Sequence, residues 1–272
     1  MHAFRDAINL VVPEGSKVLE LGGGTGVLSF FAAQKASKVW CVERNPAMVR
    51  AAKQFLDRNT GGERVQVVQA DALSYLPPEP VDVVICEMLH VALIREKQLE
   101  VLRSFAKRYL EIFGAPLPKF IPDACAQTVQ PVEQNFNFCG YDAPIPLFVQ
   151  PGTHDKEVIL SDPKAYSIIC YDSDIPERFH WSGYFTMQRE GHLNALSFFT
   201  KNFLAFVLNE NRSIDWPMNR LILPLPQTKY VHVGEQIEIG FSYNAGCPIE
   251  SLQDSLAVTF MIRELNNVPK SA

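Results

Sequence analysis

Residues 18–26 read Val-Leu-Glu-Leu-Gly-Gly-Gly-Thr-Gly, an apolar strand that runs into a glycine-rich turn. A helical pattern begins at Val27, directly after the turn. Glycine tolerates positive φ and lets a ligand approach the backbone closely, because it carries no Cβ. The alternating glycines Gly22, Gly24 and Gly26 therefore predict a strand–turn–helix unit that binds a ligand at its turn.

An acidic residue follows the next strand. The apolar run 39–42 ends in Glu43, about 20 residues after the glycine turn, where a doubly wound sheet presents a carboxylate to ribose hydroxyls. A dinucleotide fingerprint needs G-x-G-x-x-G, but the third glycine here is Gly26, one position early. The spacing therefore indicates a nucleoside ligand and disfavours a dinucleotide-dependent oxidoreductase.

Length and composition fit a globular protein with one large or two modest domains: 272 residues, 47% hydrophobic and 20% charged. Six scattered cysteines, without a C-x-x-C pair, predict neither a zinc site nor a disulfide framework, and they suit a reducing cytoplasm. The net charge of −5 argues against a large nucleic-acid footprint. No apolar run approaches the length of a membrane span. A soluble cytoplasmic protein is expected.

The first part of the chain alternates strands and helices, as a parallel α/β sheet requires. Strands are predicted at 17–21, 38–43, 65–68 and 81–85, and helices at about 3–10, 27–34, 47–59 and 93–110. Glycine and proline crowd residues 114–122 and mark a domain boundary near 122. The later apolar runs are short and separated by turn residues, which favours an antiparallel barrel or sandwich. They lie at 126–132, 167–171, 181–188, 193–208, 230–233, 236–243 and 256–262.

Ligands of parallel α/β sheets bind at the carboxyl ends of the strands, so acidic residues there are site candidates. Asp71 follows the third strand, in Ala70-Asp71-Ala72, and a mostly apolar loop bracketed by Glu87 and Glu96 follows the fourth. Two carboxylates suit the planar fork of donors on a guanidinium group. An aspartate here can also simply cap a turn, and each glutamate alone could be a solvated charge or a salt-bridge partner.

Together these motifs resemble the class I S-adenosylmethionine-dependent methyltransferases, and among them the protein arginine methyltransferases. The segment from Glu20 to Gly26 is similar to motif I of the class, and Glu87 and Glu96 have the spacing of the double-glutamate loop of the arginine enzymes. Residues 120–123 and 231–237 are similar to two later segments of that family. The resemblance covers nearly the whole chain.

The resemblance implies a Rossmann-like methyltransferase domain over 1–121, then an antiparallel β-barrel domain over 122–272 that carries a dimerisation arm, and a homodimer. S-adenosylmethionine is the implied cofactor, and the acceptor is a protein arginine, another nitrogen group or a small molecule. Glu87 and Glu96 are the implied catalytic residues, holding a guanidinium and drawing its charge away from the attacking nitrogen. The implied cofactor-binding residues are Glu20, Gly22, Gly24, Gly26, Glu43, Asp71, Ala72 and Glu87.

The chain also departs from the family pattern. The stretch 216–220 reads Trp-Pro-Met-Asn-Arg and lacks the Thr-His-Trp of the family. Within the loop, Met88 replaces an aromatic residue and His90 replaces a glycine. Two alternatives follow: the same fold and cofactor with a small-molecule or nucleic-acid substrate, or a non-catalytic binding module that keeps the fold.

Overall fold

The computed structural model describes residues 1–114, 116–153 and 157–260. Its first sheet has five parallel strands in the order β3-β2-β1-β4-β5. Their bounds are β1 Lys17–Leu21, β2 Lys38–Glu43, β3 Val65–Gln69, β4 Val83–Cys86 and β5 Lys119–Ile121. Short β-branched runs form such strands because both faces of a parallel sheet are buried. The predicted parallel core is confirmed.

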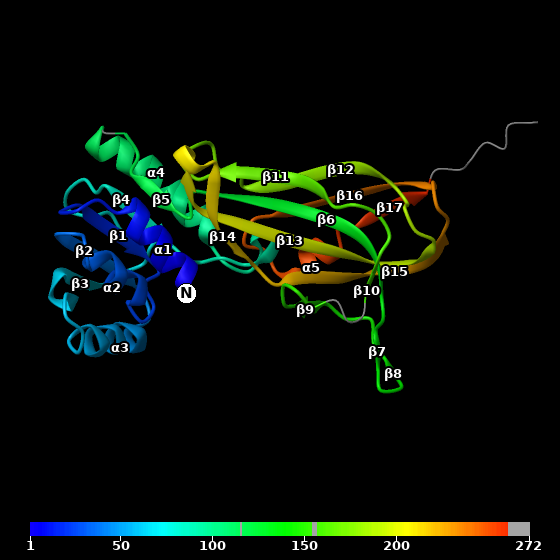
Figure 1. Ribbon diagram of the computed structural model, residues 1–272, viewed down its shortest axis with the longest axis horizontal. Coiled ribbons are helices and arrows are strands. Elements are labelled where there is room, and N and C mark those ends of the chain that lie inside the picture. Colours follow the sequence, from blue (N-terminus) through cyan, green and yellow to red (C-terminus); the bar gives the residue numbers. More distant parts are fainter. Residues whose placement is uncertain (115, 154–156, 261–272) are drawn as a thin grey trace, which may run out of the picture.

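Helices flank this sheet in Figure 1. They are α1 His2–Val11, α2 Val27–Ala33, α3 Pro46–Leu56 and α4 Gln98–Phe113, with short 3-10 turns at Gly62–Arg64 and Val91–Leu93. The start of α3 follows the predicted chemistry: the Asn45 side chain accepts a hydrogen bond from the backbone N–H of Ala47 at 2.9 Å, and proline occupies the first helical position.

The last helix of this half begins five residues later than the sequence pattern predicts, at Gln98 instead of Leu93. Leu93 and Arg95 adopt positive φ angles of 52° and 64°, which a right-handed helix excludes. The helical prediction for 93–97 was therefore wrong, and these residues extend the loop that follows β4.

The rest of the chain forms antiparallel sheets, as predicted. One sheet has the path β10-β6-β13-β15-β9, with β11 paired to β6 and β14 paired to β13; a second has the order β12-β16-β17; and β7 pairs with β8. Their bounds are β6 Ala124–Gln134, β7 Asn137–Phe138, β8 Tyr141–Asp142, β9 Leu147–Val149, β10 Glu157–Ile159, β11 Lys164–Cys170, β12 Arg178–Thr186, β13 Gly191–Val207, β14 Arg212–Pro217, β15 Arg220–Val231, β16 Gln236–Asn244 and β17 Ala257–Phe260, with α5 Ile249–Gln253 and a 3-10 turn at Leu208–Glu210. The predicted strand 256–262 reaches beyond the described residues at 261 and 262.

Aromatic side chains fill the space between the two larger antiparallel sheets. The rings of Tyr166 and Phe198, from the first of these sheets, lie 5.0 and 5.3 Å from the ring of Phe241 in the second, all with edge-to-face geometry. Buried apolar residues from both halves of the chain belong to one continuous cluster, beside a small second cluster within the antiparallel part. The parallel and antiparallel parts therefore share a core, which holds one part against the other.

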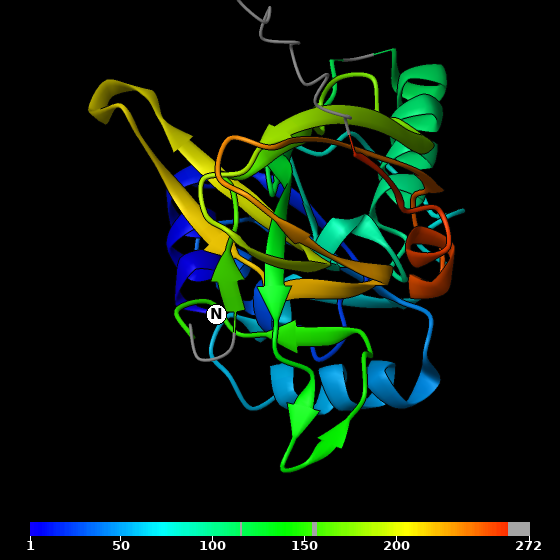
Figure 2. The ribbon, with the colours of Figure 1, turned by 90° about the vertical axis from the view of Figure 1, so that its right-hand side faces the viewer.

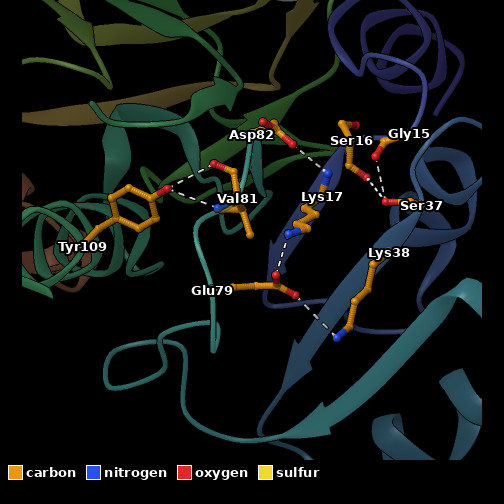
Figure 3. A network of polar contacts seen from close by, with 9 residues as sticks. All are labelled: Gly15, Ser16, Lys17, Ser37, Lys38, Glu79, Val81, Asp82 and Tyr109. Atoms are coloured by element: carbon orange, nitrogen blue, oxygen red, sulfur yellow. Dashed lines mark hydrogen bonds and ion pairs between the residues drawn. The ribbon is translucent and has the colours of Figure 1, made fainter. Parts of the chain in front are cut away.

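Polar contacts tie the amino-terminal ends of the parallel strands together (Figure 3). The ammonium of Lys17 lies 2.5 Å from one oxygen of Glu79, and Lys38 lies 3.8 Å from the other. The Tyr109 hydroxyl bonds both the N–H and the C=O of Val81, each at 3.1 Å. Because ligands of such sheets bind at the opposite, carboxyl edge, this network serves to hold the sheet.

Two hairpins leave the body of the antiparallel part in Figure 2: β7–β8, drawn in green, and β13–β14, drawn in yellow. Tyr141 on the first is 73% exposed and Leu208 at the tip of the second is 88% exposed. None of the described helices is long and apolar enough to cross a membrane.

Candidate active site

The glycine turn after β1 is shaped by positive φ angles. Gly22, Gly24 and Gly26 have φ of 79°, 53° and 79°, a backbone that other residues adopt only with strain. A methyl group added to Gly24 would meet no atom within 4 Å, whereas on Gly22 it would lie 3.0 Å from the side chain of Met88. The turn therefore presents its backbone to an open space at Gly24 and packs against the following loop at Gly22.

Glu43 holds this turn from the end of β2. Its carboxylate accepts hydrogen bonds from the N–H of Gly24 at 3.0 Å and from the N–H of Asn45 at 2.7 Å. The same carboxylate lines the cavity beside the turn. A carboxylate in this position can accept hydrogen bonds from ligand hydroxyls as well.

Glu20 is buried directly beneath the turn. Its carboxylate accepts hydrogen bonds from the backbone N–H of Ser29, at 2.9 Å, and from the Ser29 hydroxyl, at the start of α2. Burial raises the pKa of Glu20 to about 7, although the two bonds from Ser29 oppose that rise. Glu20 thus fastens the strand end to the helix that follows, and it reaches a ligand chiefly through the turn it holds.

Two cavities meet at Gly22, at the carboxyl ends of the parallel strands, and between them they are lined by the predicted site residues other than Gly26. One, of about 200 Å³, is lined among others by Glu43, Asp71, Ala72, Met88 and Glu96. The other, of about 290 Å³, is lined among others by Phe4, Glu20, Gly24, Glu87 and Trp216. Gly26 instead packs against α3: a methyl group added to it would lie 3.2 Å from the side chain of Leu56.

Asp71 has a structural role as well as a place in the cavity. Its carboxylate accepts a hydrogen bond from the N–H of Leu73 at 2.9 Å, which caps the turn after β3. The side chain is exposed and lines the same cavity as Ala72 and Glu43. The turn-capping interpretation and the ligand-binding interpretation are therefore compatible.

Glu87 and Glu96 stand at the two ends of the loop that follows β4. Removal of water at the cavity wall, together with the negative charge of Glu96, raises the pKa of Glu87 to about 7, and the amino terminus opposes that rise. Each glutamate lines one of the two cavities that meet at Gly22. The pair thus faces the same space as the glycine turn, and the negative charge of Glu96 disfavours the ionised form of Glu87.

Gln98 fixes the backbone on either side of Glu87. This buried side chain accepts a hydrogen bond from the N–H of Met88 at 2.9 Å and donates one to the C=O of Cys86 at 2.8 Å. Sequence reasoning missed it, because one glutamine in the first turn of a helix carries no signal of its own.

The antiparallel part contributes an aromatic wall to the site, from the stretch 216–220 already singled out in the sequence. Trp216, on β14, packs edge to face against Phe4 of α1 with ring centroids 5.4 Å apart. It lines the Glu87 cavity and also a neighbouring cavity of about 400 Å³. There His90 packs edge to face on Phe148, at 5.5 Å, and burial lowers the pKa of His90, which favours the neutral ring.

Comparison with known proteins agrees with this geometry. A family model described as a methyltransferase domain matches residues 18–111. An uncharacterised protein of Methanothermobacter thermautotrophicus is 33% identical over 258 residues, which cover 93% of this chain and 92% of that protein. The Danio rerio protein arginine N-methyltransferase 6 is 35% identical over 106 residues, covering 39% of this chain and 30% of that enzyme.

The fold as a whole is that of solved arginine methyltransferases. The Trypanosoma brucei PRMT1 enzyme–prozyme heterotetrameric complex with AdoHcy superposes with a TM-score of 0.72 at 18% identity, covering 96% of this chain and 90% of that one. The chain belongs to one family with the Methanothermobacter thermautotrophicus protein, and its residues 18–111 form a domain of the methyltransferase class. As a member of this class, the methyltransferase uses S-adenosylmethionine as its methyl donor.

The residues at the carboxyl edge of the sheet fit this donor. The backbone at Gly24 faces an open space that a side chain would fill. The cavities on either side of Gly22 give room for a nucleoside and an amino-acid tail. The acidic residue Glu43 offers hydrogen-bond acceptors to ribose, and no phosphate-binding charge is required at the turn.

Proposed function

We propose that this methyltransferase methylates a guanidinium nitrogen, with arginine as the acceptor group, held between Glu87 and Glu96. The observation that carries the proposal is electrostatic: the two carboxylates lie on one loop and face the cavities that meet at Gly22, and loss of water together with the negative charge of Glu96 raises the pKa of Glu87. A cation that donates hydrogen bonds to both carboxylates relieves that repulsion. A guanidinium does so with a planar fork of donors.

We assign the donor-binding roles as follows. Glu43 accepts the ribose hydroxyls, and Asp71 with Ala72 borders the adenine, because the three residues line one cavity. Gly24 gives room for close approach, Gly22 borders both cavities, Gly26 shapes the turn against α3, and Glu20 holds the turn by way of Ser29. Glu87 lies at the junction between donor and acceptor.

The bound donor supplies a methyl group on a positively charged sulfur. The acceptor nitrogen forms the new bond to the methyl carbon as the carbon–sulfur bond breaks, and the sulfur keeps the electron pair. Glu87 and Glu96 align the guanidinium and draw its positive charge away from the attacking nitrogen, which frees its lone pair. Glu87 then receives the proton that the nitrogen loses. Most of the rate enhancement comes from alignment, worth several kcal/mol in well-oriented reactions (roughly 7–11 at most).

A second acceptor class is favoured by one specific feature. The 400 Å³ cavity beside the loop is lined among others by His90, Phe148, Trp216 and Met218, and none of the described residues that line it is a lysine, an arginine or a carboxylate. A small molecule that joins a flat apolar body to a basic nitrogen would fit this cavity and place its nitrogen near Glu87. The described lining offers no cationic side chain to a nucleic acid.

We further propose that residues 1–121 form the donor domain and 122–272 the acceptor and dimerisation domain. The β7–β8 hairpin, which projects in Figure 1 and carries exposed Tyr141, would be the arm of a homodimer. All six cysteines are unpaired, which suits a cytoplasmic location. Light scattering on wild type and on Tyr141→Ser tests the dimer: a wild-type monomer would contradict it.

The function is tested by incubating the protein with labelled S-adenosylmethionine and, separately, arginine-rich polypeptide, RNA and a metabolite extract. Label on arginine, lost in Glu87→Gln and retained in the matched surface variant Glu111→Gln, supports the proposal. Label found only on RNA or on a metabolite favours the corresponding alternative. Donor binding without transfer to any of the three favours a non-catalytic module.

A further inference from the structure

The middle of the loop between Glu87 and Glu96 is held by side chains of the antiparallel part. Ala92 is fully buried and adopts φ 57° and ψ 12°, a left-handed conformation that an alanine takes only at a cost of about 1 kcal/mol or more. Its N–H donates to the hydroxyl of Thr200, on β13, at 2.8 Å. Its C=O accepts from the hydroxyl of Tyr243, at the end of β16, at 2.9 Å.

These two hydroxyls belong to a buried polar ring. Thr200 donates its own proton to the side-chain oxygen of Gln127 at 2.7 Å. Since Tyr243 spends its proton on Ala92, the hydroxyl of Tyr166, 2.8 Å away, is the donor to Tyr243. The hydroxyl of Tyr166 also lies 3.4 Å from the side-chain oxygen of Gln127, so its one proton is shared between the short bond to Tyr243 and this longer contact. Burial raises the pKa of Tyr166 and of Tyr243, so both hydroxyls keep the protons that the ring needs.

The second half of the loop, residues 93–95, is held by the turn that follows Tyr243. The N–H of Arg95 donates to the C=O of Cys247 at 2.8 Å, and the N–H of Gly246 donates to the C=O of Leu93 at 2.8 Å. Leu93 and Arg95 also have positive φ. Three non-glycine residues of one loop thus have left-handed backbone angles. Such a loop keeps its conformation only where contacts with the surrounding structure enforce it.

We propose that Thr200 and Tyr243 are positioning residues. By hydrogen bonding to the backbone N–H and C=O of Ala92, they set the distance and direction between Glu87 and Glu96. The inference rests on the proposed function for its catalytic consequence. Because Ala92 lies near the middle of the loop, a change in its backbone angles would move both Glu87 and Glu96. The antiparallel domain thereby completes a site whose carboxylates all come from the other domain.

The variants Thr200→Val and Tyr243→Phe each remove one hydroxyl at nearly constant volume and leave one polar group of Ala92 buried without a partner. Each is expected to lower kcat/KM for an arginine-rich polypeptide by about tenfold or more, since an unsatisfied buried group carries roughly that penalty. The affinity for S-adenosylmethionine, measured by calorimetry, should stay within about twofold, because the glycine turn and Glu43 are not touched. Thr200→Ser keeps the hydroxyl and should retain activity.

Hydrogen exchange over the peptide 87–96 tests the proposal without any acceptor. Exchange there should quicken in both variants and stay at the wild-type rate over 17–43; Thr228→Val and Tyr184→Phe, exposed residues of the same domain, are the matched controls. Unchanged exchange over 87–96 in both variants would overturn the proposal, as would loss of donor affinity equal to the loss of kcat/KM. If exchange quickens but wild type methylates no arginine, the positioning role is supported and the proposed acceptor fails.

Discussion

The Glu43 carboxylate accepts a hydrogen bond from the backbone N–H of Gly24 at 3.0 Å, which couples the end of β2 to the glycine turn after β1. The same carboxylate faces the cavity assigned to the ribose. Glu43→Gln should therefore weaken S-adenosylmethionine binding by about tenfold or more, because charge-assisted hydrogen bonds are stronger than neutral ones. Calorimetry measures this, with Glu111→Gln as the control. Equal donor affinity in wild type and Glu43→Gln would remove Glu43 from the donor site.

Gly24→Ala separates backbone strain from a direct effect on the ligand. The new methyl group would point into open space at φ 53°, where the donor is expected to lie. Gly114→Ala is the matched variant, because Gly114 has φ 59°, equally open surroundings and a position at the end of α4, away from the cavities. Both should lose about 1–2 kcal/mol of folding stability in urea unfolding. Only Gly24→Ala should also lose donor affinity; a comparable loss in both would mean that strain alone is responsible.

The activity should depend on pH through Glu87. Its pKa is raised to about 7 by partial loss of water and by Glu96, and the ionised carboxylate is the form that binds a guanidinium and accepts its proton. We therefore expect kcat/KM for an arginine acceptor to rise as pH increases through about 7 and to level off above it. In Glu87→Gln the remaining rate should lack this rise. A wild-type profile that is flat between pH 6 and pH 8 would contradict the assignment.

Stability should show the opposite dependence, through Glu20. Its folded-state pKa of about 7 exceeds the ordinary value of 4.5, so the folded protein binds the extra proton, and this contribution is lost as pH rises from about 4.5 through about 7. The full loss is about 3 kcal/mol at 1.4 kcal/mol per unit of pKa. In urea titrations at pH 5 and pH 8, Glu20→Gln should gain stability relative to wild type at the higher pH. A constant difference would show that Glu20 titrates near its ordinary pKa.

Trp216 lines both the donor-side and the acceptor-side cavities, so its removal should affect both ligands. Trp216→Ala is expected to weaken binding of S-adenosylmethionine and to raise KM for the acceptor, while Trp216→Phe keeps a ring against Phe4 and should be milder. A variant Trp216→Ala with unchanged KM and donor affinity would exclude the indole from both sites.

Much of the parallel domain could be predicted because its signals are local. The strand–turn–helix unit at 17–33 follows from an apolar run and alternating glycines, and the start of α3 follows from Asn45 and Pro46. Because ligands bind at the carboxyl ends of parallel strands, the sequence also predicts that Glu43, Asp71 and Glu87 lie at one edge of the sheet. Glu96 was placed by its spacing from Glu87, and it lines the neighbouring cavity.

The parts that could not be predicted depend on contacts between residues far apart in sequence. The helical pattern of 93–97 is overridden because side chains more than a hundred residues later hold Ala92, and the turn at 246–247 holds Leu93 and Arg95. Trp216 reaches the site only through the docking of β14 on α1. The side chain of Gln98 hydrogen-bonds to the backbone of Cys86 and Met88, and no pattern of side chains in the sequence predicts such a contact.

The central claim is that a guanidinium is held between Glu87 and Glu96 beside the donor. Its most direct test is a calorimetric titration of an arginine-containing peptide into protein saturated with S-adenosylhomocysteine at pH 8, compared with the same peptide carrying lysine. The account predicts that wild type binds the arginine peptide at least about tenfold more tightly than the lysine peptide, and that Glu87→Gln and Glu96→Gln each abolish this preference. Equal affinity for the two peptides, or a preference for arginine that survives in both variants, would contradict it.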